Sequence, residues 1–109
     1  MKIDIIKEQL VTGLVKIYGN LLVSIVLYGS VARGTDTEES DVDIAILLES
    51  GETREMKEKM IDLVVDLELE FDMVLSVLRI DYQKFRVWED VMPFYKNVKK
   101  EGIVLWKAA

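Results

Sequence analysis

Two acidic residues two positions apart, Asp41 and Asp43, follow a Gly29-Ser30 pair after an interval of ten residues. Residues two apart on a strand project from the same face, so both carboxylates would point the same way while Val42 points into the core. Neighbouring carboxylates repel each other, and a divalent cation removes that repulsion. Oxygen ligands of this kind suit Mg²⁺ or Mn²⁺ that also bridges to substrate phosphates. We therefore predict that Asp41 and Asp43 are catalytic, metal-binding residues.

The Gly29-Ser30 pair has the chemistry of a phosphate-binding turn. Gly29 lacks a side chain, so the backbone can turn sharply there and come close to a phosphate. Ser30 offers a hydroxyl and a backbone N–H at the expected start of a short helix, where unpaired donors favour anions. Arg33 follows in the same turn, where a phosphate contact and a structural salt bridge are equally good interpretations. Ser40 is most simply a turn residue before the strand, and contact with a ligand is the alternative.

A third carboxylate would complete a two-metal site, in which the ions clamp the attacking and leaving oxygens. Asp72 is the best candidate because it interrupts the apolar run 71–75, which is predicted to be a buried strand. An acid inside such a strand is costly unless a metal or a partner satisfies it. The chain has no His, so Asp72 is also the natural base for an acceptor hydroxyl. Glu70, on the same predicted strand face, is the alternative for this role.

The elements that position these residues follow from the hydrophobic pattern. Apolar residues at three- and four-residue spacing indicate helices, and continuous or alternating apolar runs indicate strands. The predicted order is a helix over 3–17, strands over 21–28 and 41–48, a helix over 53–67, a strand over 69–78, a helix over 83–100 and a short strand over 103–106. Pro93 should kink or break the last helix, whose aromatic stripe of Phe85, Trp88 and Tyr95 is predicted to be core. This order predicts an α/β (α+β) fold with a small mixed sheet flanked by helices.

Composition excludes several classes of chemistry. The 109 residues include no Cys and no His, which excludes thiolate nucleophiles, a Ser-His-Asp triad and His-ligated zinc. With 14 Lys and Arg against 20 Asp and Glu, the net charge is -6, which argues against direct nucleic-acid binding. We expect neither a signal peptide nor a membrane span, and hence a cytoplasmic protein. The length and the lack of linkers predict a single domain over residues 1–109.

The chain resembles the minimal nucleotidyltransferases (MNT) of the DNA polymerase β superfamily. Their signature is matched by Tyr28-Gly29-Ser30-Val31-Ala32-Arg33-Gly34, followed by Ser40-Asp41-Val42-Asp43-Ile44. The resemblance extends over most of the chain, to a closing segment at 100–105. It implies a polymerase β-like palm fold that transfers a nucleoside monophosphate from an NTP such as ATP to a hydroxyl. It also implies Mg²⁺ held by Asp41, Asp43 and Asp72, and nucleotide binding by Gly29, Ser30, Arg33 and Ser40.

Within that family, the chain resembles the antitoxin of HEPN/MNT toxin–antitoxin pairs. These antitoxins are associated with transfer of AMP from ATP onto a tyrosine of the HEPN ribonuclease toxin. The resemblance therefore implies a protein adenylyltransferase with a HEPN-type toxin as partner, in a homo- or hetero-oligomer. We expect a second chain to complete the acceptor site, because 109 residues leave little chain to hold an acceptor. The alternatives are a nucleotidyltransferase for small molecules such as aminoglycosides, a non-catalytic antitoxin that neutralises by complex formation, and a divalent-ion binding module.

Overall fold

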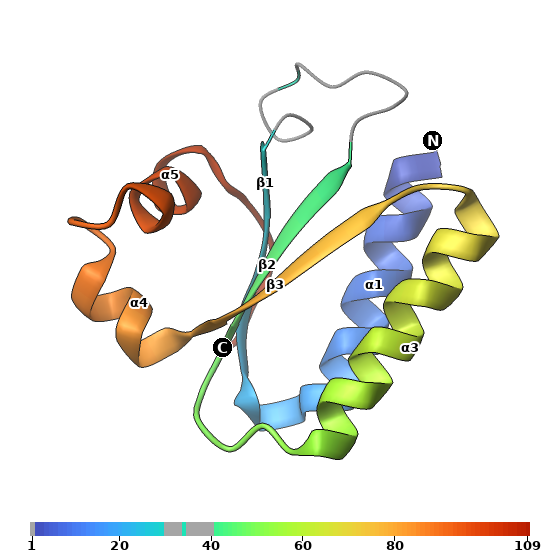
Figure 1. Ribbon diagram of the computed structural model, residues 1–109, viewed down its shortest axis with the longest axis horizontal. Helices are drawn as coiled ribbons and strands as arrows, with labels where there is room; N and C mark the ends of the chain where they lie inside the picture. The colour runs from blue at the N-terminus through green and yellow to red at the C-terminus, as the bar shows by residue number, and fades with distance from the viewer. Residues whose placement is uncertain (1, 30–33, 35–40) are drawn as a thin grey trace.

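The computed structural model describes residues 2–29, 34 and 41–109 and shows a sheet between two layers of helices (Figure 1). The described elements, in chain order, are α1 (Lys2–Tyr18), the short 3₁₀ helix η1 (Gly19–Leu21), β1 (Leu22–Tyr28), β2 (Val42–Leu48), α3 (Arg54–Phe71), β3 (Leu75–Asp81), α4 (Tyr82–Trp88), α5 (Pro93–Glu101) and β4 (Ile103–Lys107). In Figure 1 the sheet is seen nearly edge-on, with α1 and α3 on one side and α4 and α5 on the other.

The four strands form a mixed sheet, as the sequence predicts, and their order is β3-β2-β1-β4. The pairs β1–β2 and β1–β4 are antiparallel, whereas β2 and β3 are parallel. The two central strands are buried on both faces over most of their length, which explains their continuous apolar runs. Because β2 and β3 run in the same direction, both begin at the sheet edge where the antiparallel β1 ends. Gly29, Asp41 and the turn before β3 therefore lie at one edge of the sheet.

The helices α1 and α3 cover one face of the sheet and form the larger part of the core. On α1, Ile6, Leu10 and Leu14 recur at the four-residue spacing of one helix face and are almost fully buried. Helix α3 begins where the Thr53 hydroxyl accepts a hydrogen bond of 3.1 Å from the Met56 N–H. Its apolar residues at three- and four-residue spacing also pack in this core: Met56, Met60, Leu63, Val64 and Leu67.

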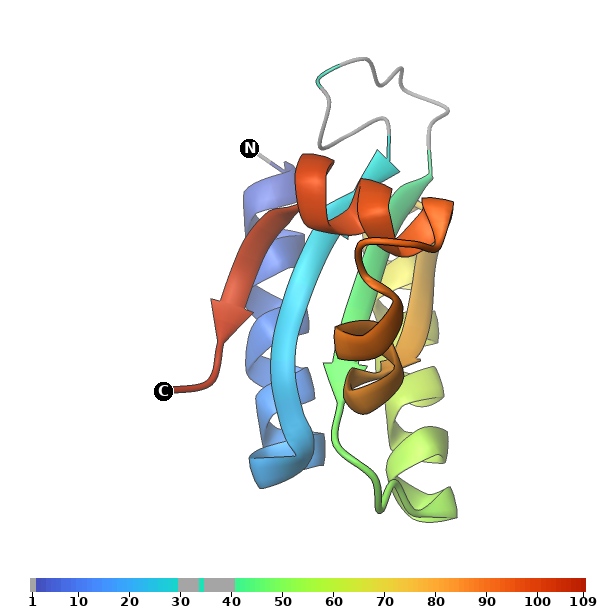
Figure 2. The same cartoon turned by 90° about the vertical axis from the view of Figure 1, so that its left-hand side faces the viewer.

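The helices α4 and α5 cover the opposite face (Figure 2). Pro93 breaks the predicted single helix into two, and it is the first residue of α5, where a missing N–H is harmless. Phe85 and Val98 are buried against the sheet, and Tyr95 is half-buried. The prediction of a core position is wrong for Trp88, which is 47% exposed. The break turns the end of α4 outward, so the helical spacing that links Trp88 to Tyr95 does not continue.

The prediction of a strand over 69–78 is wrong for its first half. Helix α3 continues to Phe71, and Asp72 ends it in the left-handed conformation, with φ 51° and ψ 50°. The Asp72 and Met73 N–H groups both donate to the Glu68 carbonyl, which closes the helix end. Phe71 lies four residues after Leu67, so it continues the apolar face of α3. The strand begins only at Leu75, and Asp72 lies in a turn outside it.

Candidate active site

Gly29 directly follows the last residue of β1, and its Cα lies against the Asp43 side chain. Its φ of +77° is a conformation that residues with a β-carbon rarely adopt. A β-carbon built at position 29 would overlap with Asp43 Oδ2 and would lie 3.1 Å from its Cγ. A glycine is therefore required both by the backbone turn and by the space that the Asp43 carboxylate occupies.

The acidic pair lies at the start of β2. Val42 is buried in the core, as expected, and its N–H donates to the Val74 carbonyl at 2.9 Å. Asp43 is half-buried and lies opposite Tyr28 on β1 and Ser76 on β3. Asp41, one residue before the strand, is exposed. In this register Asp43 projects to the face that carries α4 and α5, whereas Val42 projects to the face that carries α1 and α3.

Tyr28 is a site residue that the sequence analysis missed. Burial raises the pKa of its phenol above the ordinary value of 10.0, and the negative charge of Asp43 raises it further. Its ring packs edge-on against Phe94 of α5, with centroids 5.5 Å apart. The only sequence signal is its place directly before Gly29, because the cross-strand register that sets it beside Asp43 is a property of the folded sheet.

The structure describes only two of the other predicted site residues, Asp72 and Glu70. Ser30, Arg33 and Ser40 lie outside the described residues. Asp72 is exposed in the turn before β3, and Glu70 is exposed in the last turn of α3. The prediction that both residues lie on a strand is therefore wrong, and Asp72 is not the buried acid that the sequence predicts. The described residues contain no group of three or more acidic side chains close enough to hold a metal ion together.

The donors that are present fit a hard cation. Mg²⁺ in nucleotide sites is commonly bound through one or two carboxylates, with substrate phosphates and water as the remaining ligands. Asp41 and Asp43 supply two such carboxylates at the rim of the sheet, where a substrate can reach them. The described residues thus offer a two-carboxylate site that a bound phosphate would complete.

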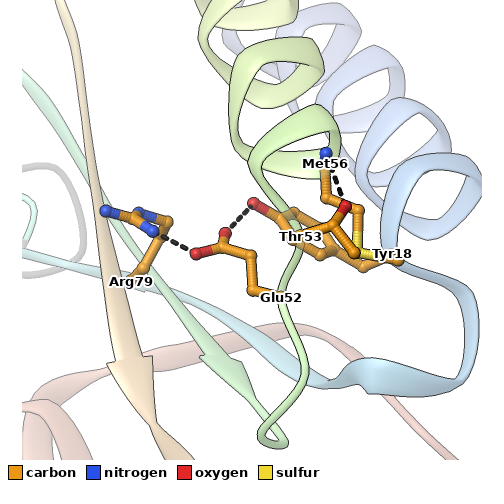
Figure 3. Close-up of polar contacts among 5 residues, drawn as sticks. All are labelled: Tyr18, Glu52, Thr53, Met56 and Arg79. Carbon is orange, nitrogen blue, oxygen red and sulfur yellow. Dashed lines mark hydrogen bonds and ion pairs between the residues drawn. The ribbon is translucent and has the colours of Figure 1, made fainter.

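A second polar cluster lies at the opposite edge of the sheet (Figure 3). The buried Tyr18 hydroxyl donates to Glu52 Oε2 at 2.7 Å, and Arg79 of β3 pairs with Glu52 Oε1. Burial and the Glu52 carboxylate raise the pKa of Tyr18 well above its ordinary value. The cluster ties the end of α1 and the loop before α3 to β3, and it is remote from Gly29. We interpret it as structural.

Comparison with known proteins decides the family. A family model described as a nucleotidyltransferase domain matches residues 7–105. The chain is a nucleotidyltransferase. The match extends from α1 into β4, so the whole sheet with both helix layers belongs to the nucleotidyltransferase fold.

Two curated relatives of this nucleotidyltransferase come from Methanocaldococcus jannaschii, and both carry the name "Putative protein adenylyltransferase". MJ0604 is 33% identical over 102 residues, which cover 91% of this chain and 93% of the relative. MJ0141 is 38% identical over 74 residues, which cover 68% of this chain and 74% of the relative.

Solved structures share the fold of this nucleotidyltransferase. One is described as a toxin-antitoxin with AMP-PNP; it has a TM-score of 0.62 and 21% identity, over 94% of this chain and 73% of that chain. Another is described as a tri-AMPylated Shewanella oneidensis HEPN toxin in complex with an MNT antitoxin. It has a TM-score of 0.58 and 18% identity, over 99% of this chain and 74% of that chain. Across the described residues of this nucleotidyltransferase, no helix is long and apolar enough to cross a membrane.

Proposed function

We propose that this nucleotidyltransferase transfers AMP from ATP to a tyrosine of a HEPN-type toxin and thereby acts as its antitoxin. The single observation that carries the proposal is the contact between Gly29 and the Asp43 carboxylate, with Asp41 one residue before β2. This contact sets a carboxylate directly against a backbone turn, where a β-carbon would overlap with it. The protein adenylyltransferase relatives and the toxin–antitoxin neighbours support the choice of AMP and of a protein acceptor.

The chain's own residues have simple roles in this reaction. Gly29 and Ser30 bind the phosphates of ATP, with Arg33 and Ser40 as the further nucleotide-binding candidates. Asp41 and Asp43 hold Mg²⁺, which when bound neutralises phosphate charge. Positioning and charge neutralisation supply most of the rate enhancement in phosphoryl-type transfers, so little other chemistry is required of the protein.

The group transfer balances without a further reagent. The phenol oxygen of the acceptor forms a bond to the α-phosphorus of ATP, and the bond from that phosphorus to the bridging oxygen of pyrophosphate breaks. The phenolic proton passes to a carboxylate, for which Asp72 is the candidate and Glu70 the alternative. Because β2 and β3 begin at the same edge, the Asp72 turn lies at the rim that carries Asp41.

The test mixes the purified chain with Mg²⁺, ATP labelled in its α-phosphate, and a purified HEPN-type toxin. We expect label on the toxin, mapped by mass spectrometry to a tyrosine, and loss of labelling when EDTA removes the cation. The double variant Asp41→Asn/Asp43→Asn should lose at least 100-fold in rate, in line with removal of a principal charge-stabilising group. Asp66→Asn, an exposed acid on α3, is the matched control and should label at the wild-type rate.

Three outcomes contradict the proposal. Labelling by the double variant at the wild-type rate would show that the acidic pair does not serve the transfer. A double variant that cannot label the toxin but still protects cells from it would identify a non-catalytic antitoxin. Labelling of an aminoglycoside in place of the toxin, in a panel of small acceptors, would identify a small-molecule enzyme.

A further inference from the structure

A cavity of about 200 Å³ opens beside Gly29, between the end of β1 and helix α5. Figure 2 shows α5 lying across β1 near its end, on the face to which Asp43 projects. The cavity is lined by Tyr28, Gly29, Phe94, Asn97, Val98 and Glu101. Four of these residues, from Phe94 to Glu101, belong to α5, so the helix that begins at Pro93 forms one wall.

The lining suits a flat heteroaromatic ring and not a phosphate. Phe94 stands edge-on to Tyr28 at an interplanar angle of 89° and is still 39% exposed, so part of its ring is open to a ligand. The Asn97 amide offers both a donor and an acceptor. Among the described residues that line the cavity, none is a lysine or an arginine. The cavity is also smaller than the roughly 300–1,000 Å³ of pockets that enclose a drug-sized ligand, which favours one ring system over a whole nucleotide.

We propose that this cavity receives the base of the NTP, with Phe94 against the ring and Asn97 reading its edge. The proposal rests on the proposed function, because it assumes that the phosphates bind at Gly29. In a nucleotide the base is joined to the phosphates through one ribose, and the cavity shares Gly29 with the phosphate turn. An Asn side chain pairs with adenine through two hydrogen bonds, so Asn97 favours ATP. Aromatic side chains stack on any base, so Phe94 contributes affinity but discriminates little between the four bases.

The acceptor then approaches from the other side of β2. Ser76, directly opposite Asp43 on β3, is exposed, and Leu78 on the same face of that strand is 41% exposed. Within the described part of the chain, exposed side chains of β3 line this side of Asp43, whereas α5 walls the Gly29 side. A tyrosine carried by a partner protein can reach the open side without displacing a helix.

The test measures nucleotide binding by calorimetry with the complete chain and Mg²⁺, so it does not depend on transfer to any acceptor. The probes are ATP, GTP, CTP, UTP and inorganic tripolyphosphate, which has no base. Asn97→Ala should weaken ATP binding about 10-fold to 100-fold, the size of a lost bidentate base contact, and should leave tripolyphosphate binding unchanged. Phe94→Ala should weaken all four NTPs. Asn20→Ala, an exposed amide in η1 at the opposite edge of the sheet, is the matched control and should bind ATP like the wild type.

Because Phe94 packs on Tyr28, Phe94→Leu is measured alongside Phe94→Ala to keep an apolar side chain in that contact. Wild-type ATP affinity in both Asn97→Ala and Phe94→Ala would overturn the proposal. An equal loss of ATP and tripolyphosphate would also overturn it, because the phosphates and not the base would then be affected. Unchanged ATP affinity with loss of toxin labelling alone would make the cavity an acceptor pocket. Failure of the proposed function looks different: the wild type would bind ATP with the expected base dependence and transfer no AMP.

Discussion

The Asp43 carboxylate lies against the Cα of Gly29, in a space that a β-carbon at position 29 would occupy. The two residues are 14 positions apart in the sequence, and antiparallel pairing of Tyr28 with Asp43 brings them together. The glycine and the second acid of the signature are therefore one structural unit. The size of the side chain at each of these two positions is limited by the residue at the other position. This is the physical reason for a glycine at position 29 beside an aspartate at position 43.

Replacement of Gly29 by alanine should damage both the fold and the site. The φ of +77° is unfavourable for alanine by about 1–2 kcal/mol. The new methyl group would also displace the Asp43 carboxylate, so AMP transfer should fall at least tenfold beyond any loss of folded protein. Chemical denaturation measures the first effect, and the transfer assay at full folding measures the second.

Gly19→Ala is the matched control for that experiment. Gly19 also has a positive φ, of +53°, but nothing lies within 4 Å of the position where a β-carbon would stand. This variant should lose a similar free energy of unfolding and keep wild-type transfer. Equal transfer by the Gly29→Ala and Gly19→Ala variants would mean that the position of Asp43 does not depend on Gly29.

Tyr18→Phe should change how stability depends on pH. Burial, followed by the hydrogen bond to Glu52, raises the Tyr18 pKa in the folded chain above its ordinary value of 10.0. Between the unfolded and the folded pKa, the unfolded chain releases the phenolic proton and the folded chain retains it. The unfolded state then binds fewer protons, so the free energy of unfolding falls as the pH rises through about 10.

Denaturation at pH 8 and near pH 11 therefore separates two effects of the Tyr18 hydroxyl. At pH 8 the Tyr18→Phe variant should be less stable than the wild type by about 1 kcal/mol, because the hydrogen bond to Glu52 is lost. Near pH 11 the difference should shrink, because only the wild type has lost the contribution from Tyr18. A difference that stays constant over this range would argue against a raised Tyr18 pKa. The double variant Tyr18→Phe/Glu52→Gln shows how much of the effect passes through Glu52.

The pattern of the central elements could be predicted from the sequence, whereas the end of α3 could not. The apolar run over 21–28 is typical of a strand that is buried on both faces. Pro93 is expected to break a helix or to begin one. The segment after Leu67 is different, because Phe71 fits both a helix that continues by four residues and a strand that alternates with Met73. Backbone bonds from Asp72 and Met73 to the Glu68 carbonyl favour the helix, and they form only when the chain folds.

The candidate site shows the same division between local and long-range information. The spacing of Gly29, Asp41 and Asp43 predicts their chemistry, and strand alternation places Asp43 and Val42 on opposite faces of the sheet. Tyr28 and Asn97 could not be found in this way. The first is joined to the site by cross-strand register, and the second by the packing of α5 on β1. Neither the register between two strands nor the packing of a helix on a strand can be predicted from the pattern of a single sequence.

Removal of the Glu68 carboxylate should weaken the start of β3. Glu68 Oε2 accepts a hydrogen bond of 3.0 Å from the Leu75 N–H, so one side chain of α3 secures the first residue of the strand. Glu68→Ala should cost about 1–2 kcal/mol in the free energy of unfolding, because a partly buried N–H loses a charged acceptor. Glu68→Gln should cost less, since its amide oxygen can still accept. The control is Glu58→Ala, whose exposed pair with Arg54 should be worth about 0.5 kcal/mol at most. Equal losses for Glu68→Ala and Glu58→Ala in urea denaturation would contradict a role for this bond.

The third carboxylate can be assigned by comparing Asp72→Asn with Glu70→Gln. Asparagine tolerates the left-handed backbone at position 72 about as well as aspartate does, so this variant should keep the fold while losing the charge. If Asp72 accepts the phenolic proton, Asp72→Asn should lower kcat for AMP transfer about 100-fold or more with little change in the KM for ATP. Glu70→Gln, in the last turn of α3, should leave both constants unchanged. A large loss in Glu70→Gln together with an active Asp72→Asn would reverse the assignment. Full activity in both variants would mean that the Asp41 and Asp43 pair works without a third carboxylate from this segment.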